Sequence, residues 1–161
     1  IKTAEFIYMS DDYDLTVQDI AKISGLKRPS IYKFFPSNES LLEAISEKHT
    51  NKLLLLIKKN FKSVNYKNIS ELIKILIDVI AIYLTNNSPL SNLIFTDHSK
   101  KLIKDELFEQ LNSVSNCSEL KIRYSLSILI SCLEDSFMEG GNLSPQQLAE
   151  TKKACLHYLN N

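Results

Sequence analysis

The sequence predicts an all-α fold of about nine helices, on three observations. Only 3 glycines and 4 prolines interrupt 161 residues, so helices are favoured over strands and loops. Apolar residues recur at intervals of three and four, the spacing of one helix face, and no segment alternates as a half-buried strand does. At several points Ser, Thr or Asn stands three residues before Asp, Glu or Gln, a pairing typical of helix starts.

The first such pair opens a helix-turn-helix at residues 16–38. Thr16 is the predicted N-cap, and the carboxylate of Asp19 is expected to reach back to the free backbone amide. One apolar stripe on this short helix consists of Val17, Ile20 and Ala21. Gly25 permits the positive φ that a tight turn after the helix requires.

A second short helix, from about Arg28 to Phe35, has an apolar and a basic side. Ile31 and either Phe34 or Phe35 are expected to face inward. Residues 20–38 contain four cations and no acid, an arrangement suited to phosphates and base edges. The predicted DNA contacts are Thr16, Lys27, Arg28, Ser30, Tyr32 and Lys33. A solvated helix face is the alternative for the cations.

This segment resembles the DNA-binding domain of the TetR family of bacterial transcriptional regulators. The family pattern is matched without a gap by Thr16, Val17, Ile20, Ala21, Ser24, Gly25, Leu26, Ile31, Tyr32, Phe35, Ser37 and Leu41. Ala4, Ile7 and Tyr8 fit the tail of the family's first helix, so a short basic arm is expected to be missing before residue 1.

Two positions depart from the family pattern. Asp12 replaces a glycine, which is tolerable because Asp can adopt a left-handed conformation. Asn38 replaces a lysine that in the family is set against the DNA backbone. Because an amide can still donate a hydrogen bond to a phosphate, Asn38 is also a predicted DNA contact.

The remaining helices are placed by their start signals. The predicted starts are Ser37 for a long helix to about Phe61, Asn68 with Glu71 for a helix over 72–84, and Ser88-Pro89 for the next. Further helices are expected over 102–111, over 120–137 with its start at Asn116 and its end at Gly140-Gly141, and after the capping box at Ser144.

The helix over 72–84 is apolar nearly all round and is therefore expected at the centre of a bundle. Its narrow polar stripe consists of Lys74, Asp78 and Thr85. We expect Asp78 to pair with Lys74 four residues away, and a contact with a cationic ligand is the alternative.

Two apolar stripes near the C-terminus are candidates for a dimer interface. They consist of Ile122, Leu126, Leu129, Leu133 and Phe137 on one helix and of Leu148, Leu156 and Leu159 on the next. The resemblance implies that these two helices form a four-helix bundle with a second subunit, and a helix-turn-helix normally acts as a dimer. Completion of a monomer's core is the alternative, and the mixed opposite face of the 120–137 helix leaves the partner-facing side open.

The resemblance also implies two domains and a small-molecule effector. Residues 1–46 form the expected DNA-binding domain, and residues 47–161 form the ligand-binding and dimerisation domain. The ligand is expected in the core of the larger domain, where aromatic and small polar groups lie among apolar ones. The candidate contacts are Asp78, Tyr83, Phe95, Phe108, Tyr124 and Ser131, with ordinary core packing as the alternative for each.

Other features argue against further function classes. Net charge is zero, so only the local basic run indicates nucleic acid. No nucleophile with a paired base, phosphate loop or metal-ligand cluster is visible, so we predict no enzyme activity, no cofactor and no metal site. Cys117, Cys132 and Cys155 fit buried thiols in a reducing cytosol. Charges break the longest apolar stretches and no signal peptide opens the chain, so we expect a cytoplasmic protein without a membrane span.

The sequence thus predicts a ligand-responsive DNA-binding transcriptional regulator. The preferred form is a homodimeric repressor that an unidentified small molecule releases from its double-stranded operator. The alternative is a coactivator of the same fold that binds a protein partner or a ligand without operator contact. DNA binding through several phosphates falls steeply with salt, which distinguishes the two.

Overall fold

The computed structural model describes residues 1–9, 16–63, 68–88 and 90–160, and every regular element in these ranges is helical. The helices are α1 (Lys2–Met9), α2 (Val17–Ser24), α3 (Arg28–Tyr32), α4 (Asn38–Ser63), α5 (Ile69–Asn86), the 3-10 helix η1 (Leu90–Phe95), α6 (Asp97–Asn112), α7 (Glu119–Gly140) and α8 (Pro145–Asn160). The all-α prediction is confirmed.

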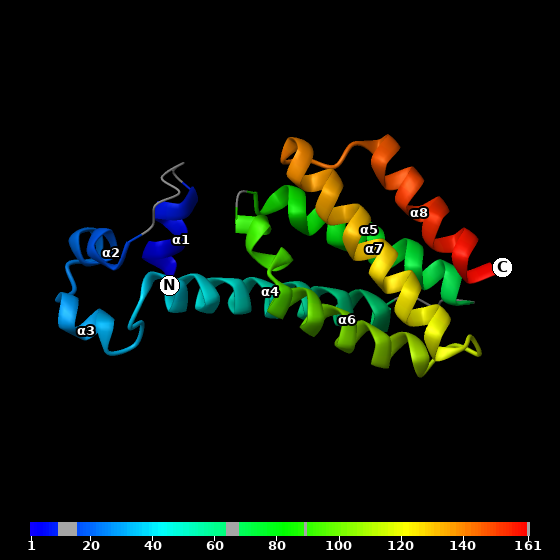
Figure 1. The fold of residues 1–161 in the computed structure, drawn as a ribbon, viewed down its shortest axis with the longest axis horizontal. Helices are drawn as coiled ribbons and strands as arrows, with labels where there is room; N and C mark the ends of the chain where they lie inside the picture. The colour runs from blue at the N-terminus through cyan, green and yellow to red at the C-terminus, as the bar shows by residue number, and fades with distance from the viewer. Residues whose placement is uncertain (10–15, 64–67, 89, 161) are drawn as a thin grey trace.

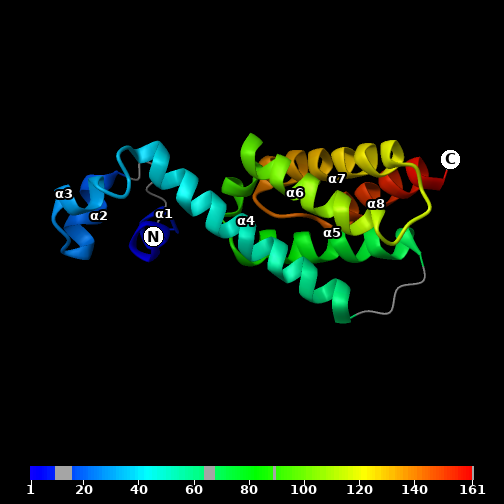
Figure 2. The same ribbon diagram turned by 90° about the horizontal axis from the view of Figure 1, so that it is seen from below.

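The molecule is elongated, with two helical groups joined by α4. Helices α1 to α3 lie at one end, and α5 to α8 form a bundle at the other (Figure 1). Figure 2 shows α4 running from the small group along the side of the bundle. Each group has its own core: Leu41 and Ile45 of α4 belong to the first, whereas Leu53 and Ile57 belong to the second. The expected domain boundary at residue 46 therefore falls inside a continuous helix.

Local capping signals position several helices as predicted. The Asn68 side chain accepts a hydrogen bond from the Glu71 amide at 3.0 Å and opens α5. Ser144 and Gln147 exchange side-chain to backbone hydrogen bonds at the start of α8. The last turn of α7 ends at Gly141, whose φ of 68° places it in the left-handed region that favours glycine.

Three predicted starts need correction or lie outside the described residues. Helix α7 begins at Glu119 and is capped by Ser118 instead of Asn116, because the Ser118 hydroxyl accepts the Lys121 amide. Helix α6 begins five residues before the predicted 102, since the Thr96 side chain caps it. Pro89, half of the predicted Ser88-Pro89 start, lies outside the described residues.

Helix α5 lies in the bundle as its composition predicts. Nine of its side chains are buried, among them Leu76, Ile77 and Ile80, and it contacts α4, α7 and α8. The expected partner of Asp78 was wrong, however. Asp78 pairs with Lys152 of α8 at 2.5 Å, because α8 lies against the polar stripe of α5 and its lysine reaches the carboxylate.

The apolar stripe of α7 faces its own chain, which corrects the predicted dimer interface. Its members Ile122, Leu126, Leu129, Leu133 and Phe137 are at most 1% exposed in the single chain and pack in the core of the bundle. A side chain without accessible surface has none to offer a partner. The reason is the position of α7, which packs against α6 and α8 and contacts α5 as well, so the chain's own helices cover the stripe. On α8, Leu159 is also buried, whereas Leu148 and Leu156 keep partial exposure.

Candidate DNA-binding surface and effector groove

The turn between α2 and α3 is built by local hydrogen bonds. Thr16 Oγ1 accepts the Asp19 amide at 3.2 Å, as an N-cap should. The Asp19 carboxylate accepts the Thr16 hydroxyl instead of the predicted backbone amide, so the two side chains hold each other. Gly25 ends α2 with a φ of 69°, the conformation that the sequence predicted there.

The inner face of α3 attaches this short helix to the first core. Ile31 is buried, and Phe35 packs partly buried against the same cluster. Phe34 is 72% exposed, so of the two aromatic candidates Phe35 is the inward one. Helix α3 ends at Tyr32, three residues before the predicted end, because the amides of Phe34 and Phe35 both bond to the Ile31 carbonyl in a tight turn.

The outer side of α3 carries the predicted DNA contacts. The side chains of Lys27, Arg28, Ser30, Tyr32 and Lys33 are all exposed. Among the described residues, none of these side chains makes a hydrogen bond or an ion pair within the chain. Their donors and charges are therefore available to an external partner.

Asn38 has a structural contact that sequence reasoning missed. Its Oδ1 accepts a hydrogen bond from the Val17 amide at 3.0 Å, which ties the start of α4 to the start of α2. The first amides of a helix have no intrahelical acceptor, so this side chain satisfies one of them. Because the residues lie 21 positions apart, no local sequence pattern marks the contact. Asn38 is exposed, and its amide nitrogen makes no hydrogen bond within the described chain.

A buried polar network connects the two helical groups through α4. His49 of α4 lies 2.9 Å from Glu5 Oε1 of α1 through Nε2 and 2.8 Å from the Tyr83 hydroxyl of α5 through Nδ1. Lys48 Nζ pairs with the other Glu5 oxygen at 2.6 Å. Tyr83, a predicted ligand contact, thus lies in this network, and its hydroxyl also contacts the His49 carbonyl at 3.0 Å.

The environment of this network favours neutral His49. Burial lowers the pKa of His49, against the opposing effect of the Glu5 carboxylate. Burial acts to raise the pKa of Glu5, but hydrogen bonds from Lys48 and His49 outweigh it and hold the pKa below its ordinary value. The Tyr83 hydroxyl donates its one proton to the His49 carbonyl, so the direction of its contact with Nδ1 depends on the imidazole tautomer, whereas the Glu5 carboxylate can only accept at Nε2.

A second set of buried polar contacts fastens α4 to α6. The Thr50 hydroxyl donates to Ser99 Oγ at 2.9 Å, and Ser99 Oγ lies 2.8 Å from Ser46 Oγ. Ser46 in turn donates to the Leu93 carbonyl of η1 at 2.6 Å. Both sets come from residues 46–50, near the middle of α4, and connect this helix to α1, η1, α5 and α6.

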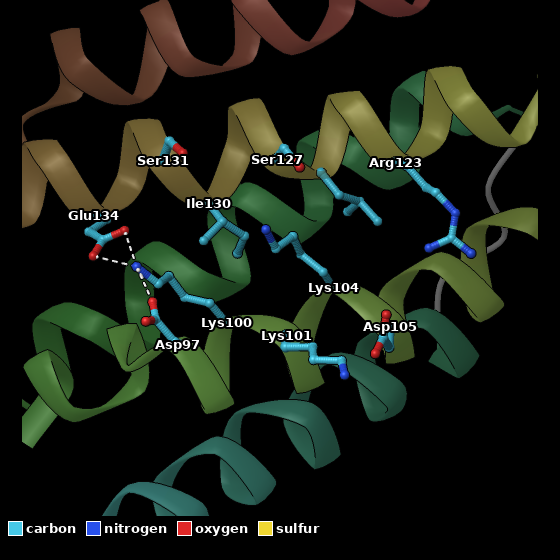
Figure 3. A pocket seen from close by; sticks show the side chains of 11 residues that line it. Asp97, Lys100, Lys101, Lys104, Asp105, Arg123, Ser127, Ile130, Ser131 and Glu134 are labelled. Carbon is cyan, nitrogen blue, oxygen red and sulfur yellow. Dashed lines mark hydrogen bonds and ion pairs between the residues drawn. The ribbon is translucent and has the colours of Figure 1, made fainter.

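A groove between α6 and α7 is one candidate cavity for an effector. It has a volume of about 490 Å³, within the range of small-molecule sites. Figure 3 shows its charged rim and the serines of α7 above it. The groove is lined by Asp97, Lys100, Lys101, Lys104, Asp105, Arg123, Leu126, Ser127, Ile130, Ser131 and Glu134.

The six predicted ligand contacts do not converge on one site. Only Ser131 lines this groove, although Phe108 lies beside it beneath Arg123, at 3.7 Å from the guanidinium carbon to the ring centre. Phe95 packs on Phe137 in the core with a ring separation of 6.1 Å.

Two of the six lie outside the core, where the ligand was expected. Asp78 is a surface residue paired with α8. Tyr124 is 51% exposed and contacts Tyr158 edge to face. In both cases the helix presents the residue to the outside, because its apolar neighbours on the opposite side fill the core.

The outer face of α7 and α8 is one part of the bundle that the chain leaves uncovered. Its large side chains on α7 are Leu120, Tyr124 and Met138, which are 58%, 51% and 62% exposed. Tyr158 of α8 lies beside Tyr124. The α7–α8 outer face therefore holds the exposed apolar surface that the buried stripe does not.

Three further features bear on the class of site. In the described part of the chain, no group of three or more His, Cys, Asp or Glu side chains is placed to hold a metal ion. No described helix has the length and apolar character needed to cross a membrane. Cys155 is buried, and burial raises the pKa of its thiol to about 12, so the thiol is inert near neutral pH.

Comparison with known proteins agrees with this geometry. A family model described as bacterial regulatory proteins of the tetR family matches residues 2–45. The fold is similar to the crystal structure of a TetR-family transcriptional regulator from Streptomyces coelicolor, with a TM-score of 0.79 over 99% of this chain and 94% of that chain at 13% identity. At that identity the likeness concerns the fold. No curated protein matches the chain.

Proposed function

We propose that the chain is a member of the TetR family of bacterial regulatory proteins, whose model matches residues 2–45, and that it is a homodimeric repressor released from its operator by a small molecule. DNA-binding transcriptional regulation follows from the family. The repressor role, the dimer and the effector are the parts of the proposal that require their own support.

The observation that carries the proposal is the exposed outer side of α3. Arg28 lies on α3, and Lys27 and Lys33 cap its two ends. Ile31 and Phe35 pack this segment on the first core, and none of the three cations is paired within the described chain. A rigid helix with free donors meets the needs of major-groove binding, in which phosphate contacts position the protein and base contacts specify the sequence. A protein-binding coactivator has no need for such a surface.

We assign the dimer interface to the α7–α8 outer face. One short recognition helix contacts too few base pairs, so helix-turn-helix proteins pair two copies across a two-fold axis. Leu120, Tyr124 and Met138 supply exposed apolar area there, with Leu148 and Leu156 partly exposed on α8. Both elements lie at the end of the molecule away from α3 (Figure 1).

The effector response is assigned to α4. Ser46 and Thr50 connect α4 to the N-terminal turn of α6, and His49 connects it to α1 and α5. A ligand that shifts α6 would thereby move α4, and α4 carries the first core through Leu41 and Ile45. In a dimer, the two α3 helices must be separated by the distance between successive major grooves. A movement of α4 that changes this separation would therefore weaken DNA binding.

Fluorescence anisotropy with DNA from the upstream region of its own gene tests the proposal. Lys33→Ala should weaken binding to this DNA and to unrelated duplex, because a phosphate contact is lost. Lys59→Ala is the matched control, since Lys59 is an exposed lysine of α4 without an ion pair in the described chain. Equal affinity of both variants and the native protein would place DNA elsewhere than on α3.

A further inference from the structure

Phe34 is an aromatic side chain that the core does not use. It is 72% exposed, more than any other large apolar side chain in the described part of the chain. The adjacent Phe35 packs with Ile31 against the first core, so the attachment of α3 does not need Phe34. Single exposed apolar side chains are common on protein surfaces, and exposure alone therefore assigns no role to Phe34.

The backbone keeps the helical register of α3 as far as Phe34. The residue between α3 and Phe34 has helical dihedrals, with φ −62° and ψ −32°, and the Phe35 amide bonds to the Ile31 carbonyl four residues back at 2.9 Å. Side chains four and seven residues apart lie on the same side of a helix, so Phe34 shares a side with Ser30 and Lys27. The surface that carries the predicted DNA contacts thus extends by one turn to Phe34.

The charges around Phe34 indicate the partner of this surface. Lys27, Arg28 and Lys33 are exposed and have no ion pair within the described chain. A partner for them is anionic, and it must also offer Phe34 an apolar contact. Double-stranded DNA offers both, because phosphates line its backbone and the 5-methyl group of thymine is an apolar group at the base edges of the major groove.

Phe34 adds a kind of contact that the polar side chains of this surface cannot make. The hydroxyl of Ser30 and the charge of Lys33 interact with phosphates or with hydrogen-bonding groups of the bases. The thymine methyl has no such group, so its recognition requires an apolar side chain, and phenylalanine is one of the side chains that makes this contact. Phe34 can therefore distinguish thymine from cytosine, which lacks the methyl group.

We propose that Phe34 is a specificity-determining residue that recognises thymine in the major groove through apolar contact with its 5-methyl group. The inference rests on the proposed function, since it requires that the α3 surface binds DNA. Base contacts specify the sequence, whereas phosphate contacts position the protein. Phe34 should therefore affect the choice of DNA sequence and have little effect on binding to unrelated duplex.

Selection of duplexes from a random-sequence pool tests the preference. The native protein should select sites with thymine at two symmetry-related positions, and Phe34→Ala should select sites in which these two positions vary. Phe34→Leu keeps an apolar side chain and should keep most of the preference. Phe6→Ala is the matched control, because Phe6 is a phenylalanine of α1 that is 67% exposed, and it should select the native sites. A thymine preference that is absent from the native protein, or unchanged in Phe34→Ala, would overturn the proposal.

Replacing the selected thymines by deoxyuridine tests the methyl contact itself. Deoxyuridine pairs as thymine does and lacks only the methyl group. In fluorescence anisotropy the native protein should bind the deoxyuridine duplex about fourfold more weakly for each methyl group lost, and roughly tenfold or more for both. Phe34→Ala should bind the two duplexes equally. An equal loss in the native protein and in Phe34→Ala would show that the methyl group acts without Phe34, and would refute the assignment.

The binding of unrelated duplex separates this proposal from the proposed function. Phe34→Ala should keep the native affinity for unrelated duplex, its salt dependence and the native melting temperature, because Phe34 is exposed and uncharged. Absent or salt-insensitive DNA binding by the native protein would contradict the proposed function and this inference with it. Salt-dependent DNA binding with the same sequence preference in the native protein and Phe34→Ala would contradict this inference alone, and would favour a protein partner for Phe34.

Discussion

Asn38 has a structural contact to α2, and we predict a DNA contact for the same side chain. Its oxygen accepts the Val17 amide, and its nitrogen makes no hydrogen bond within the described chain. The lysine usual in the family could supply a cation at this position but could not accept the amide. The two roles can therefore be separated by substitutions of opposite character.

Substitutions of Asn38 should change the stability of the fold and the affinity for DNA in opposite directions. Asn38→Asp keeps the acceptor and places a negative charge at the start of α2, so the melting temperature should hold or rise while DNA binding weakens. Asn38→Lys leaves the Val17 amide without its acceptor, costing about 1 kcal/mol, or roughly 2–4 °C in melting temperature, while DNA binding at low salt tightens. Thermal melts and anisotropy measure both; parallel changes in the two quantities would contradict this account of Asn38.

His49 gives the fold a pH dependence with a defined sign. Its pKa is lowered in the folded chain, so the unfolded chain takes up a proton first as the pH falls. The contribution of neutral His49 is complete above the ordinary pKa of 6.5 and is lost as the pH falls below it toward the folded pKa.

Thermal melts at pH 7.5 and 5.5 check this prediction. The native protein should lose stability between these pH values, and His49→Gln, which does not titrate, should lose less. His98→Gln is the control, because His98 is exposed, and it should keep the native pH response. An identical pH response in His49→Gln and the native chain would rule out His49 as its source.

At the scale of whole helices, α7 shows what a sequence pattern can and cannot predict. Helix starts at Asn68 and Ser144 were predictable, because a cap and its partner lie three residues apart. The apolar stripe of α7 was also visible, but periodicity identifies a face without saying what covers it. Its partners α5, α6 and α8 come from elsewhere in the chain, as does the Lys152 partner of Asp78.

The same limit applied to the site residues. The exposed cations of α3 were predictable from a short local motif, whereas the contact of Asn38 to Val17 and the network around His49 connect residues 21 to 44 positions apart. The groove cations were missed because each of Lys104 and Arg123 looks like an ordinary surface charge on its own helix. The packing of α6 against α7 makes both helices line one groove, which the pattern of neither helix shows alone.

A carboxylate introduced on the buried face of α7 should have a different effect from one introduced on its exposed face. Leu129→Asp places a carboxylate in the core of one chain and should unfold it or lower its stability by several kcal/mol, about 3–5. Tyr124→Asp changes an exposed position of the α7–α8 outer face and should give a folded monomer. Analytical ultracentrifugation with circular dichroism measures both. A folded monomer from Leu129→Asp together with a dimer from Tyr124→Asp would restore the original stripe as the interface.

In the whole molecule, α4 is the helix that connects the two helical groups. It contributes Leu41 and Ile45 to the first core and Leu53 and Ile57 to the second. Its polar contacts fix its rotation relative to α1, α5 and α6. Breaking a buried hydrogen bond costs free energy, because the group left behind has no partner. These contacts therefore favour movement of α4 together with its neighbouring helices over sliding of α4 past them.

The central claim is that the α3 surface of a dimer binds DNA, and the salt dependence of binding to upstream DNA tests it most directly. Three α3 cations on each of two subunits predict that the logarithm of the association constant falls linearly with the logarithm of salt concentration, with a slope of about −5. Unrelated duplex should bind more weakly with a similar slope, since phosphates carry most of the salt dependence. Absent or salt-insensitive binding by the native dimer would contradict the repressor account and favour a coactivator that binds a protein partner.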